Sequence, residues 1–376
     1  MNVAKLLNNG INRIARLCLS KENYEIYTYK YGELSFLKKR HPERYYIPFR
    51  KRWPWNYEKK YYIVRNSADT GTGIFSYAKH YIFDAEWAES NGYVPLADIE
   101  MENDFSAKRI GTYNEWSIFF EQPQLKDVIG NRKNRIYCGY LNGHKFKEEM
   151  CCDINKDKCC NTIRCVENSW REYYTNIKHY VDKWLVVNEL LFDDEYKRMI
   201  SQMEGNNVLG VFIRDAFHKD LNDKYSAIKA REVFSKHPLS DYIINEICIV
   251  ERKYKEWNCN KVVLFTMCTE TEALFDLKFG KDLIVYNRDR QSYSELADYV
   301  NNSYENKIGN NKYKTKDEYL RTIEMDSVYI QEVIALSKCD YFIGTKASGT
   351  AMALAFNGGQ YKDILLFDDD NKIDRY

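Results

Sequence analysis

The sequence predicts an α/β protein built from two doubly wound domains, each a parallel sheet with helices on both faces. The chain has 376 residues, which exceeds the usual size of one core and suits two domains of roughly 150–200 residues. Apolar residues make up 44% of it, enough for a sizeable core. Short apolar runs alternate with longer segments of helical periodicity in both halves, which is the pattern of parallel α/β sheets.

The first strand–helix–strand unit begins near Tyr61. The run Tyr61–Arg65 is typical of a short strand, and Asp69–Gly73 is a tight, glycine-containing loop. Apolar residues at helical spacing predict a helix over Ile74–Asn91, which Gly92 ends. Tyr93–Ile99 is the next expected strand, so this segment forms the beginning of a parallel sheet.

The same alternation resumes after Leu209, following a long helical pattern over Ser169–Met203. Strands are expected at Leu209–Ile213, Lys261–Thr266, Leu283–Tyr286, Tyr341–Gly344 and Ile364–Phe367, and helices at Leu239–Trp257, Val328–Leu336 and Thr350–Phe356. We place the domain break between about 170 and 205. The prediction is therefore an N-terminal appendage at 1–60 and two Rossmann-like domains, at 61–204 and 205–376.

The N-terminal appendage is basic and rich in aromatic residues. Residues 1–60 contain 14 Lys and Arg against five Asp and Glu, and the whole chain has a net charge of only +1, which excludes a globally basic nucleic-acid binder. Such a segment suits peripheral contact with an anionic membrane surface, or it is simply a solvated surface. No apolar run reaches 18 residues and the N-terminus lacks the apolar core of a secretion signal, so we expect a cytoplasmic protein.

The chain has 11 Cys, an odd number that favours reduced thiols in a cytosol. Five of them, Cys151, Cys152, Cys159, Cys160 and Cys165, lie within 15 residues. Structural zinc sites need four ligands with two-residue spacings, which adjacent cysteine pairs fit poorly. We therefore expect free or buried thiols and no metal.

Polar and glycine-rich loops follow three of the expected strands in the second half. Arg214-Asp215 follows the first, Met267–Glu270 the second, and Thr345–Thr350 the fourth. Parallel sheets bind ligands at the carboxyl ends of their strands. An arginine there offers a fork of donors to a diphosphate, and small residues before a helix let backbone N–H groups approach a phosphate. A salt-bridged structural arginine and an ordinary strand-to-helix turn are the alternatives.

The order of four motifs resembles a known family. They are G-V-F-I-R (Gly210–Arg214), K-H-P-L-S-D-Y-I (Lys236–Ile243), K-V-V-L-F-T (Lys261–Thr266) and L-S-K-C-D-Y-F-I-G-T-K-A-S-G-T (Leu336–Thr350). They look like the nodulation-type and core α-1,6-fucosyltransferase superfamily and its bacterial surface-polysaccharide relatives. The early glycine loop, Asn114-Glu115-Trp116 and Phe119–Pro123 also resemble such transferases.

The resemblance implies a GT-B-like fold, in which two Rossmann-type domains face a cleft, and inverting, metal-independent glycosyl transfer without a cofactor. The donor would be a nucleotide sugar, usually GDP-fucose, in the C-terminal domain, and the acceptor a glycan or lipid-linked glycan on the N-terminal one. Arg214 would hold the diphosphate, Ser348 and its neighbours the phosphate side, and Thr266 the nucleoside side. Phe212, Met267 and Cys268 depart from the family pattern, and Glu270 would replace the missing base-side carboxylate.

We expect the donor to be bound by Gly71, Gly73, Arg214, Thr266, Glu270, Thr345, Lys346, Ser348, Gly349 and Thr350. Catalysis is assigned to Arg214 together with one carboxylate among Asp215, Asp220 and Asp223, which would remove the proton of the acceptor hydroxyl. Two alternatives stay open from the sequence: a non-catalytic nucleotide-sugar or glycan-binding protein on the same fold, and an enzyme that uses a different nucleotide sugar or another small molecule.

Overall fold

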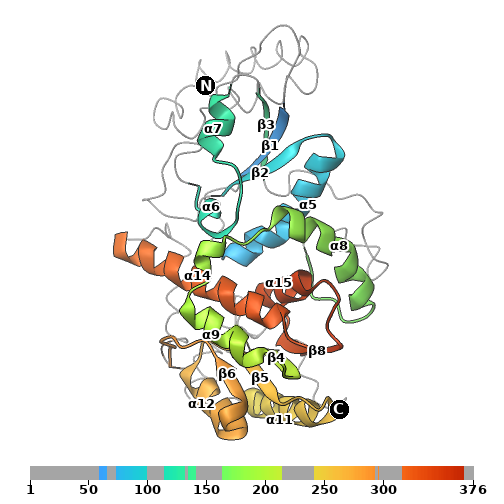
Figure 1. Ribbon diagram of the computed structural model, residues 1–376, viewed down its shortest axis with the longest axis vertical. Coiled ribbons are helices and arrows are strands. Elements are labelled where there is room, and N and C mark those ends of the chain that lie inside the picture. The colour runs from blue at the N-terminus through green and yellow to red at the C-terminus, as the bar shows by residue number, and fades with distance from the viewer. Residues whose placement is uncertain are drawn as a thin grey trace, which may run out of the picture.

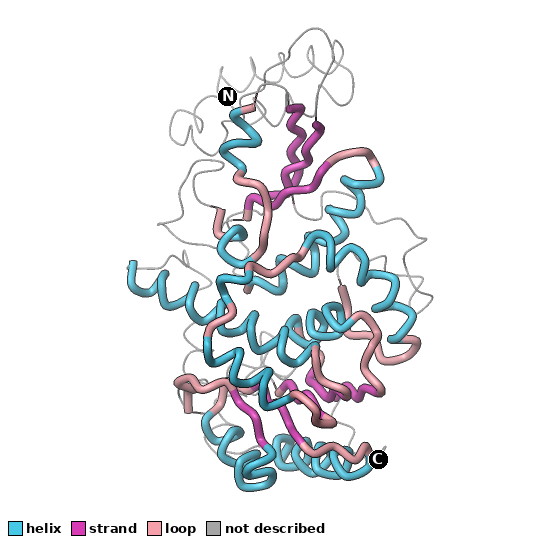
Figure 2. The backbone as a smooth tube through the Cα atoms, viewed as in Figure 1, coloured by secondary structure: helices cyan, strands magenta, loops and turns pink. Residues whose placement is uncertain are grey.

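The computed structural model describes residues 59–65, 73–99, 114–131, 134–140, 163–213, 241–292, 295 and 316–367. Two parallel sheets are separated by a layer of helices, and further helices lie beyond the C-terminal sheet (Figure 1). The tube view shows the same order of sheet, helices and sheet (Figure 2). The predicted α/β class with parallel sheets is confirmed.

The N-terminal sheet has three strands in the order β2-β1-β3. They are β1 (Lys59–Arg65), β2 (Val94–Asp98) and β3 (Asn134–Tyr140), all parallel. The predicted strand–helix–strand unit is present, because α5 (Ile74–Ser90) connects β1 to β2. Side chains alternate along β1: Tyr62 and Val64 pack in the same apolar cluster as α5, whereas Tyr61 and Ile63 pack with Leu125 of α7 (Leu125–Gly130).

The C-terminal sheet has five parallel strands in the order β6-β5-β4-β7-β8. The strands are β4 (Val208–Phe212), β5 (Lys261–Phe265), β6 (Leu283–Val285), β7 (Tyr341–Thr345) and β8 (Asp363–Phe367). All five strands predicted for this half are found. The chain moves outward from β4 to β6 and then crosses back to β7 beside β4, so the strand order reverses between β4 and β7.

Helices cover both faces of this sheet, which makes it doubly wound. One face carries α11 (Asp241–Glu256) and α12 (Thr269–Phe279), and Val211 and Leu264 pack there with Ile247 and Phe275. The other face carries α9 (Asp194–Met203), α14 (Lys316–Ser337) and α15 (Ser348–Asn357). The central strands are buried on both sides, and this explains why they are almost continuous apolar runs in the sequence.

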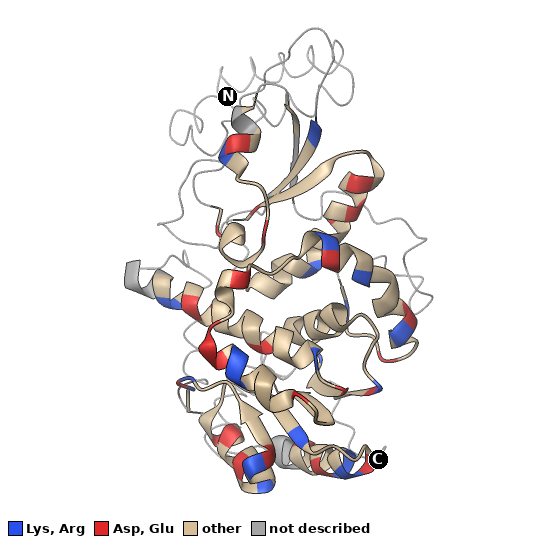
Figure 3. Ribbon diagram, in the orientation of Figure 1, with Lys and Arg blue, Asp and Glu red and all other residues tan. Residues whose placement is uncertain are grey.

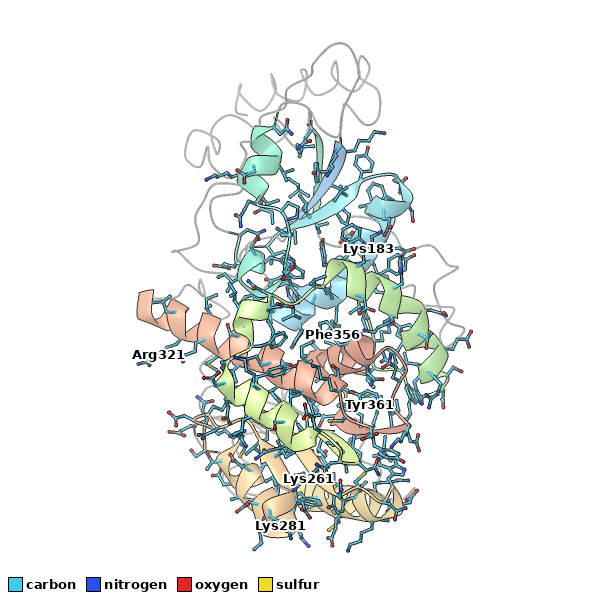
Figure 4. All side chains as sticks on the ribbon, in the orientation of Figure 1. Lys183, Lys261, Lys281, Arg321, Phe356 and Tyr361 are labelled. Atoms are coloured by element: carbon cyan, nitrogen blue, oxygen red, sulfur yellow. The ribbon has the colours of Figure 1, made fainter. Side chains whose placement is uncertain are left out.

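One apolar cluster joins the two sheets. It contains Val64 of β1, Phe342 of β7 and most of α5 and α15, and Phe356 lies in the middle of this layer (Figure 4). The helix α8 (Trp170–Trp184) also contacts C-terminal elements, since Arg171 donates to the carbonyl oxygens of Gly359 at 2.8 Å and Lys362 at 3.1 Å. The domain boundary at 204/205 and the cleft between two domains stay predictions.

Several helical segments, including α7 and α12, differ from the expectation. The pattern over Ser169–Met203 is two helices, α8 and α9, separated by a short 3-10 turn at Glu189–Leu191 (η3). The helix expected at Val328–Leu336 is longer and starts at Lys316. A further short helix, α6 (Trp116–Phe119), and a 3-10 turn, η5 (Gly280–Asp282), were not predicted.

Several sequence predictions concern residues outside the described ranges: the basic appendage up to residue 58, Gly71, Cys151–Cys160, and the segment 214–240. Cys165 is described, and its thiol donates to the carbonyl oxygen of Ala347 at 3.4 Å. Among the described helices, none is both long enough and apolar enough to span a bilayer. The described residues also bring together no group of three His, Cys, Asp or Glu side chains suited to a metal ion.

Candidate functional site

The candidate site is the carboxyl edge of the C-terminal sheet where β4 and β7 lie side by side. Ile213 continues β4, is 1% exposed, and donates its backbone N–H to the carbonyl oxygen of Phe265 at 2.9 Å. Arg214 follows it directly in the chain, and Asp215, Asp220 and Asp223 come next, all outside the described residues. The loop after β7 begins one strand away. Reversal of strand order at this point opens the crevice in which doubly wound sheets bind ligands.

The turn from β7 into α15 is closed by its own threonines. The Thr350 hydroxyl donates to the carbonyl oxygen of Thr345 at 2.6 Å, and these residues are 0% and 6% exposed. The Thr350 side chain is therefore engaged within the turn, and Thr345 contributes its backbone carbonyl oxygen to that bond. The donor-binding role predicted for the two residues stays a prediction. Lys346 and Ser348 are only half-buried and lie on the accessible part of the turn.

The N-terminus of α15 suits an anion. Its N-cap is Ala347, whose methyl side chain has no hydrogen-bond acceptor, and its first turn contains no acidic residue. The backbone N–H groups of the first turn and the helix dipole then favour a bound negative group. By contrast, α12 carries Glu270 and Glu272 in its first turn, so negative charge already occupies that helix terminus. Figure 3 shows α15 without charged residues, whereas α11 and α12 carry many.

Gly349, in the first turn of α15, allows unusually close packing. A Cβ atom at this position would lie 2.2 Å from the Tyr329 hydroxyl oxygen and 2.6 Å from the Phe212 ring. Phe212 in turn stacks on Phe265, with ring centroids 4.3 Å apart. The glycine predicted for phosphate binding is thus needed at least for the approach of α14 and β4 to this turn.

Replacement of Gly349 with alanine is therefore expected to destabilise the fold by about 1–3 kcal/mol, because overpacking forces the rigid Tyr329 and Phe212 rings to shift. Urea denaturation of the two proteins measures this difference. The double variant Gly349→Ala/Tyr329→Phe should regain part of the loss, since it removes the hydroxyl oxygen nearest to the new methyl group. Equal stability of Gly349→Ala and the native chain would contradict the packing described here.

Tyr329 also connects this site to the N-terminal sheet. Its ring lies 4.8 Å from the Phe75 ring and 5.1 Å from the Phe265 ring, measured between centroids. Phe75 is in the first turn of α5, whose N-cap is Gly73. Tyr329 thus packs against both the first turn of α5 and a strand of the C-terminal sheet. The donor-binding role of Gly73 stays a prediction.

The residues after β5 have structural roles. Thr266 is fully buried, and its side-chain oxygen accepts the Cys268 backbone N–H at 3.1 Å. The Cys268 thiol donates to the Glu270 carboxylate at 3.1 Å. The loop after β6 is hydrogen-bonded to this segment, because the backbone N–H of Gln291 donates to the carbonyl oxygen of Met267 at 3.2 Å. Glu270, the predicted base-side carboxylate, is therefore already engaged by a neighbour.

A buried ion cluster beside these residues was not predicted. Arg288 and Arg290, in the loop after β6, both donate to the carbonyl oxygen of Thr266, at 3.1 and 3.2 Å. Glu332 of α14 lies between them, with its carboxylate 3.1 Å from the Arg288 guanidinium and 3.8 Å from that of Arg290. Arg290 also pairs with Glu272 at 2.8 Å. The Glu332 and Arg290 side chains are each 2% exposed.

This cluster has unused hydrogen-bonding capacity. Within the described part of the chain, both carboxylate oxygens of Glu332 and the Nε atom of Arg288 are buried without a well-oriented hydrogen-bond partner. Burial outweighs the two guanidinium groups and raises the pKa of Glu332 to about 7. Buried polar groups are normally satisfied, so these atoms are candidates for contact with a further polar group. The only signal in the sequence was a charged residue within the apolar run of α14.

Comparison with known proteins gives weak similarities. No protein-family model matches the chain, and no curated protein matches it by sequence. Among solved structures, NodZ α-1,6-fucosyltransferase soaked with GDP-fucose shares 12% identity, over 83% of this chain and 97% of that one, with a TM-score of 0.44. The same enzyme co-crystallised with GDP shares 12% identity, over 83% of this chain and 96% of that one, with a TM-score of 0.44. POFUT1 in its apo form shares 10% identity, over 84% of this chain and 75% of that one, with a TM-score of 0.26. Similarity of this size assigns no function.

Proposed function

We propose that this protein is a glycosyltransferase that binds a nucleotide-sugar donor at the carboxyl edge of its C-terminal sheet. Two features at one edge of this sheet support the proposal. The first is the helix N-terminus at Ala347–Thr350, which suits an anion. The second is the buried cluster of Glu332 and Arg288, which has polar atoms without a hydrogen-bond partner among the described residues. A nucleoside diphosphate has an anionic end and a polar base, which match these two features.

The diphosphate would lie against the N-terminus of α15. Backbone N–H groups of its first turn, Lys346 and Ser348 are the described groups suited to phosphate oxygens. Arg214 follows the neighbouring strand and would supply a bidentate guanidinium from the other side of the crevice. These groups would also stabilise the charge that builds on the departing diphosphate.

The base would be recognised near Glu332. Guanine presents N1–H and N2–H donors beside the O6 acceptor. This edge complements a carboxylate next to an arginine whose Nε atom has no hydrogen-bond partner among the described residues. Glu332 thus supplies the base-side carboxylate that Met267 and Cys268 do not provide and that Glu270 was expected to provide. We therefore propose a GDP-sugar donor, with GDP-fucose as the first candidate.

The reaction would be inverting and metal-independent, with no cofactor. The acceptor hydroxyl attacks the anomeric carbon, the bond to the diphosphate breaks, and a carboxylate receives the hydroxyl proton. Asp215, Asp220 and Asp223 are the sequence candidates for that carboxylate. A cytoplasmic protein with residues 1–60 against an anionic membrane would suit a lipid-linked glycan acceptor in surface polysaccharide synthesis.

A thermal-shift panel of GDP, UDP, dTDP and CMP tests the donor proposal. GDP at 100 times its Kd is expected to stabilise the native chain by about 2.7 kcal/mol, because it binds only the folded state. Guanosine and pyrophosphate alone serve as controls and should each stabilise less. Preference for UDP would reject guanine recognition, and no response to any nucleotide would reject the donor site. Stabilisation by GDP without turnover of GDP-fucose would favour a binding protein.

A further inference from the structure

The Asp193 carboxylate contacts both elements that carry the buried ion cluster. Asp193 is the N-cap of α9, and one of its carboxylate oxygens accepts the backbone N–H of Tyr196 at 2.9 Å. The other oxygen accepts two donors. One is the hydroxyl of Tyr286, the first residue of the loop after β6 (residues 286–291), which we call the arginine loop. The second is the side-chain amide of Gln331 on α14, at 3.3 Å.

Asp193 therefore links the two halves of the cluster. Tyr286 lies two residues before Arg288, and Gln331 lies directly before Glu332. The backbone N–H of Asp193 also donates to the side-chain oxygen of Gln331 at 3.2 Å, so two reciprocal hydrogen bonds join the start of α9 to α14. A single residue thus holds the arginine loop and the helix with the glutamate in one arrangement.

Two further side chains of α9 hold the start of the arginine loop. Glu195 accepts the backbone N–H of Asn287 at 2.7 Å, and Arg198 donates to the carbonyl oxygen of Val285 at 2.7 Å. Glu195 and Arg198 also pair with each other at 2.6 Å. Together with the contact of Asp193, three successive residues are each hydrogen-bonded to α9 or its N-cap just before the chain reaches the arginines. α9 accordingly lies against both β6 and α14 (Figure 1).

We propose that Asp193 is a positioning residue that sets the base specificity of the donor site. Its bond to Tyr286 places the arginines, since the carbonyl oxygen of Tyr286 accepts the Arg290 guanidinium at 3.0 Å. Its bonds to Gln331 place Glu332 opposite them. Groups that recognise a ligand must be held within about 0.5 Å of the productive geometry. The inference rests on the proposed function, in which this cluster recognises guanine, and Asp193 has no role at the diphosphate.

Asp193→Asn tests the proposal in the full-length chain, by calorimetric titration of GDP and of pyrophosphate. Asparagine caps a helix as well as aspartate does, so its oxygen keeps the bond to Tyr196. Its amide nitrogen then replaces the acceptor of Tyr286 and Gln331. The Kd for GDP is expected to rise about 10-fold, because one well-placed base contact gives discrimination of this order, and the Kd for pyrophosphate should stay unchanged.

Tyr286→Phe breaks the same hydrogen bond from the other side and keeps the aromatic ring. It should also weaken GDP binding and leave pyrophosphate binding unchanged. The double variant Asp193→Asn/Tyr286→Phe should lose less GDP affinity than the sum of the two single losses, since both single changes remove one shared contact. Full additivity would overturn the proposed link between Asp193 and the arginine loop.

Asp194→Asn is the matched control. Asp194 is the next residue, its side chain is fully exposed, and it pairs at 3.1 Å with Lys197 on the helix surface. This variant should keep the native affinity for GDP and for pyrophosphate. Native GDP affinity in Asp193→Asn, or an equal loss of affinity for GDP and pyrophosphate, would overturn the proposal alone. A native chain that binds no GDP would reject the proposed function, and this inference with it.

Discussion

Replacing Arg214 with alanine is expected to abolish sugar transfer while leaving the fold intact. The residue follows Ile213, which is fixed by its hydrogen bond to Phe265 at the point where the strand order reverses. A guanidinium starting there would reach the same crevice as the N-terminus of α15. Loss of one donor that stabilises the charge of a leaving group typically lowers kcat by about 100- to 1,000-fold.

The measurement is GDP release from GDP-fucose together with calorimetric titration of GDP. The variant should also bind GDP more weakly, because one charge-assisted bidentate contact is lost. Arg321→Ala is the matched control, because Arg321 is exposed on the outer part of α14 (Figure 4). This variant should keep the native rate of GDP release and the native affinity for GDP. Near-normal turnover by Arg214→Ala would show that the diphosphate is held elsewhere.

Replacing Glu332 with alanine is expected to cost about 3–5 kcal/mol of unfolding free energy, because it leaves the buried Arg288 without its counter-ion. The Glu332 side chain is 2% exposed and Arg288 is 16% exposed, so little water is at hand to replace the carboxylate. Urea denaturation near pH 7 measures the change. Glu332→Gln should cost less, since it keeps the volume and resembles the protonated carboxyl group.

Glu251→Ala is the matched control for this prediction. Glu251 also pairs with two cations, Lys255 at 2.8 Å and Lys278 at 3.2 Å, but its side chain is 32% exposed. Surface pairs of this kind contribute little to stability, because water screens the charges. If Glu332→Ala and Glu251→Ala lowered the unfolding free energy by the same small amount, the cluster around Glu332 would not be a buried ion cluster in solution.

Local pattern was sufficient for much of the fold. Every strand of the C-terminal sheet was predicted, because strands such as Val208–Phe212 are buried on both faces and stand out as apolar runs between polar loops. The helix α12 was missed because its apolar residues do not gather on one helical face, although Phe275 is fully buried. Strand β3 was missed because N-R-I-Y-C-G-Y alternates only partly and contains a glycine.

The candidate site was predictable only where it depends on strand ends. The strands β4 and β7 end side by side as expected, because neighbouring parallel strands end at the same edge. The hydrogen bond from the Thr350 hydroxyl to the Thr345 carbonyl oxygen was not predictable, since a hydroxyl group that closes its own turn looks the same in the sequence as one that binds phosphate. The cluster of Glu332 with Arg288 was missed because partners 44 residues apart meet only in the folded chain.

The structure of the chain with bound GDP tests the central claim most directly. The account predicts phosphate oxygens about 2.7–3.2 Å from backbone nitrogens of Ser348–Thr350, with the guanine edge against Glu332 and Arg288. GDP bound anywhere else, for example at the N-terminus of α12 or on the N-terminal sheet alone, would contradict the account, as would the absence of bound GDP at saturating concentration.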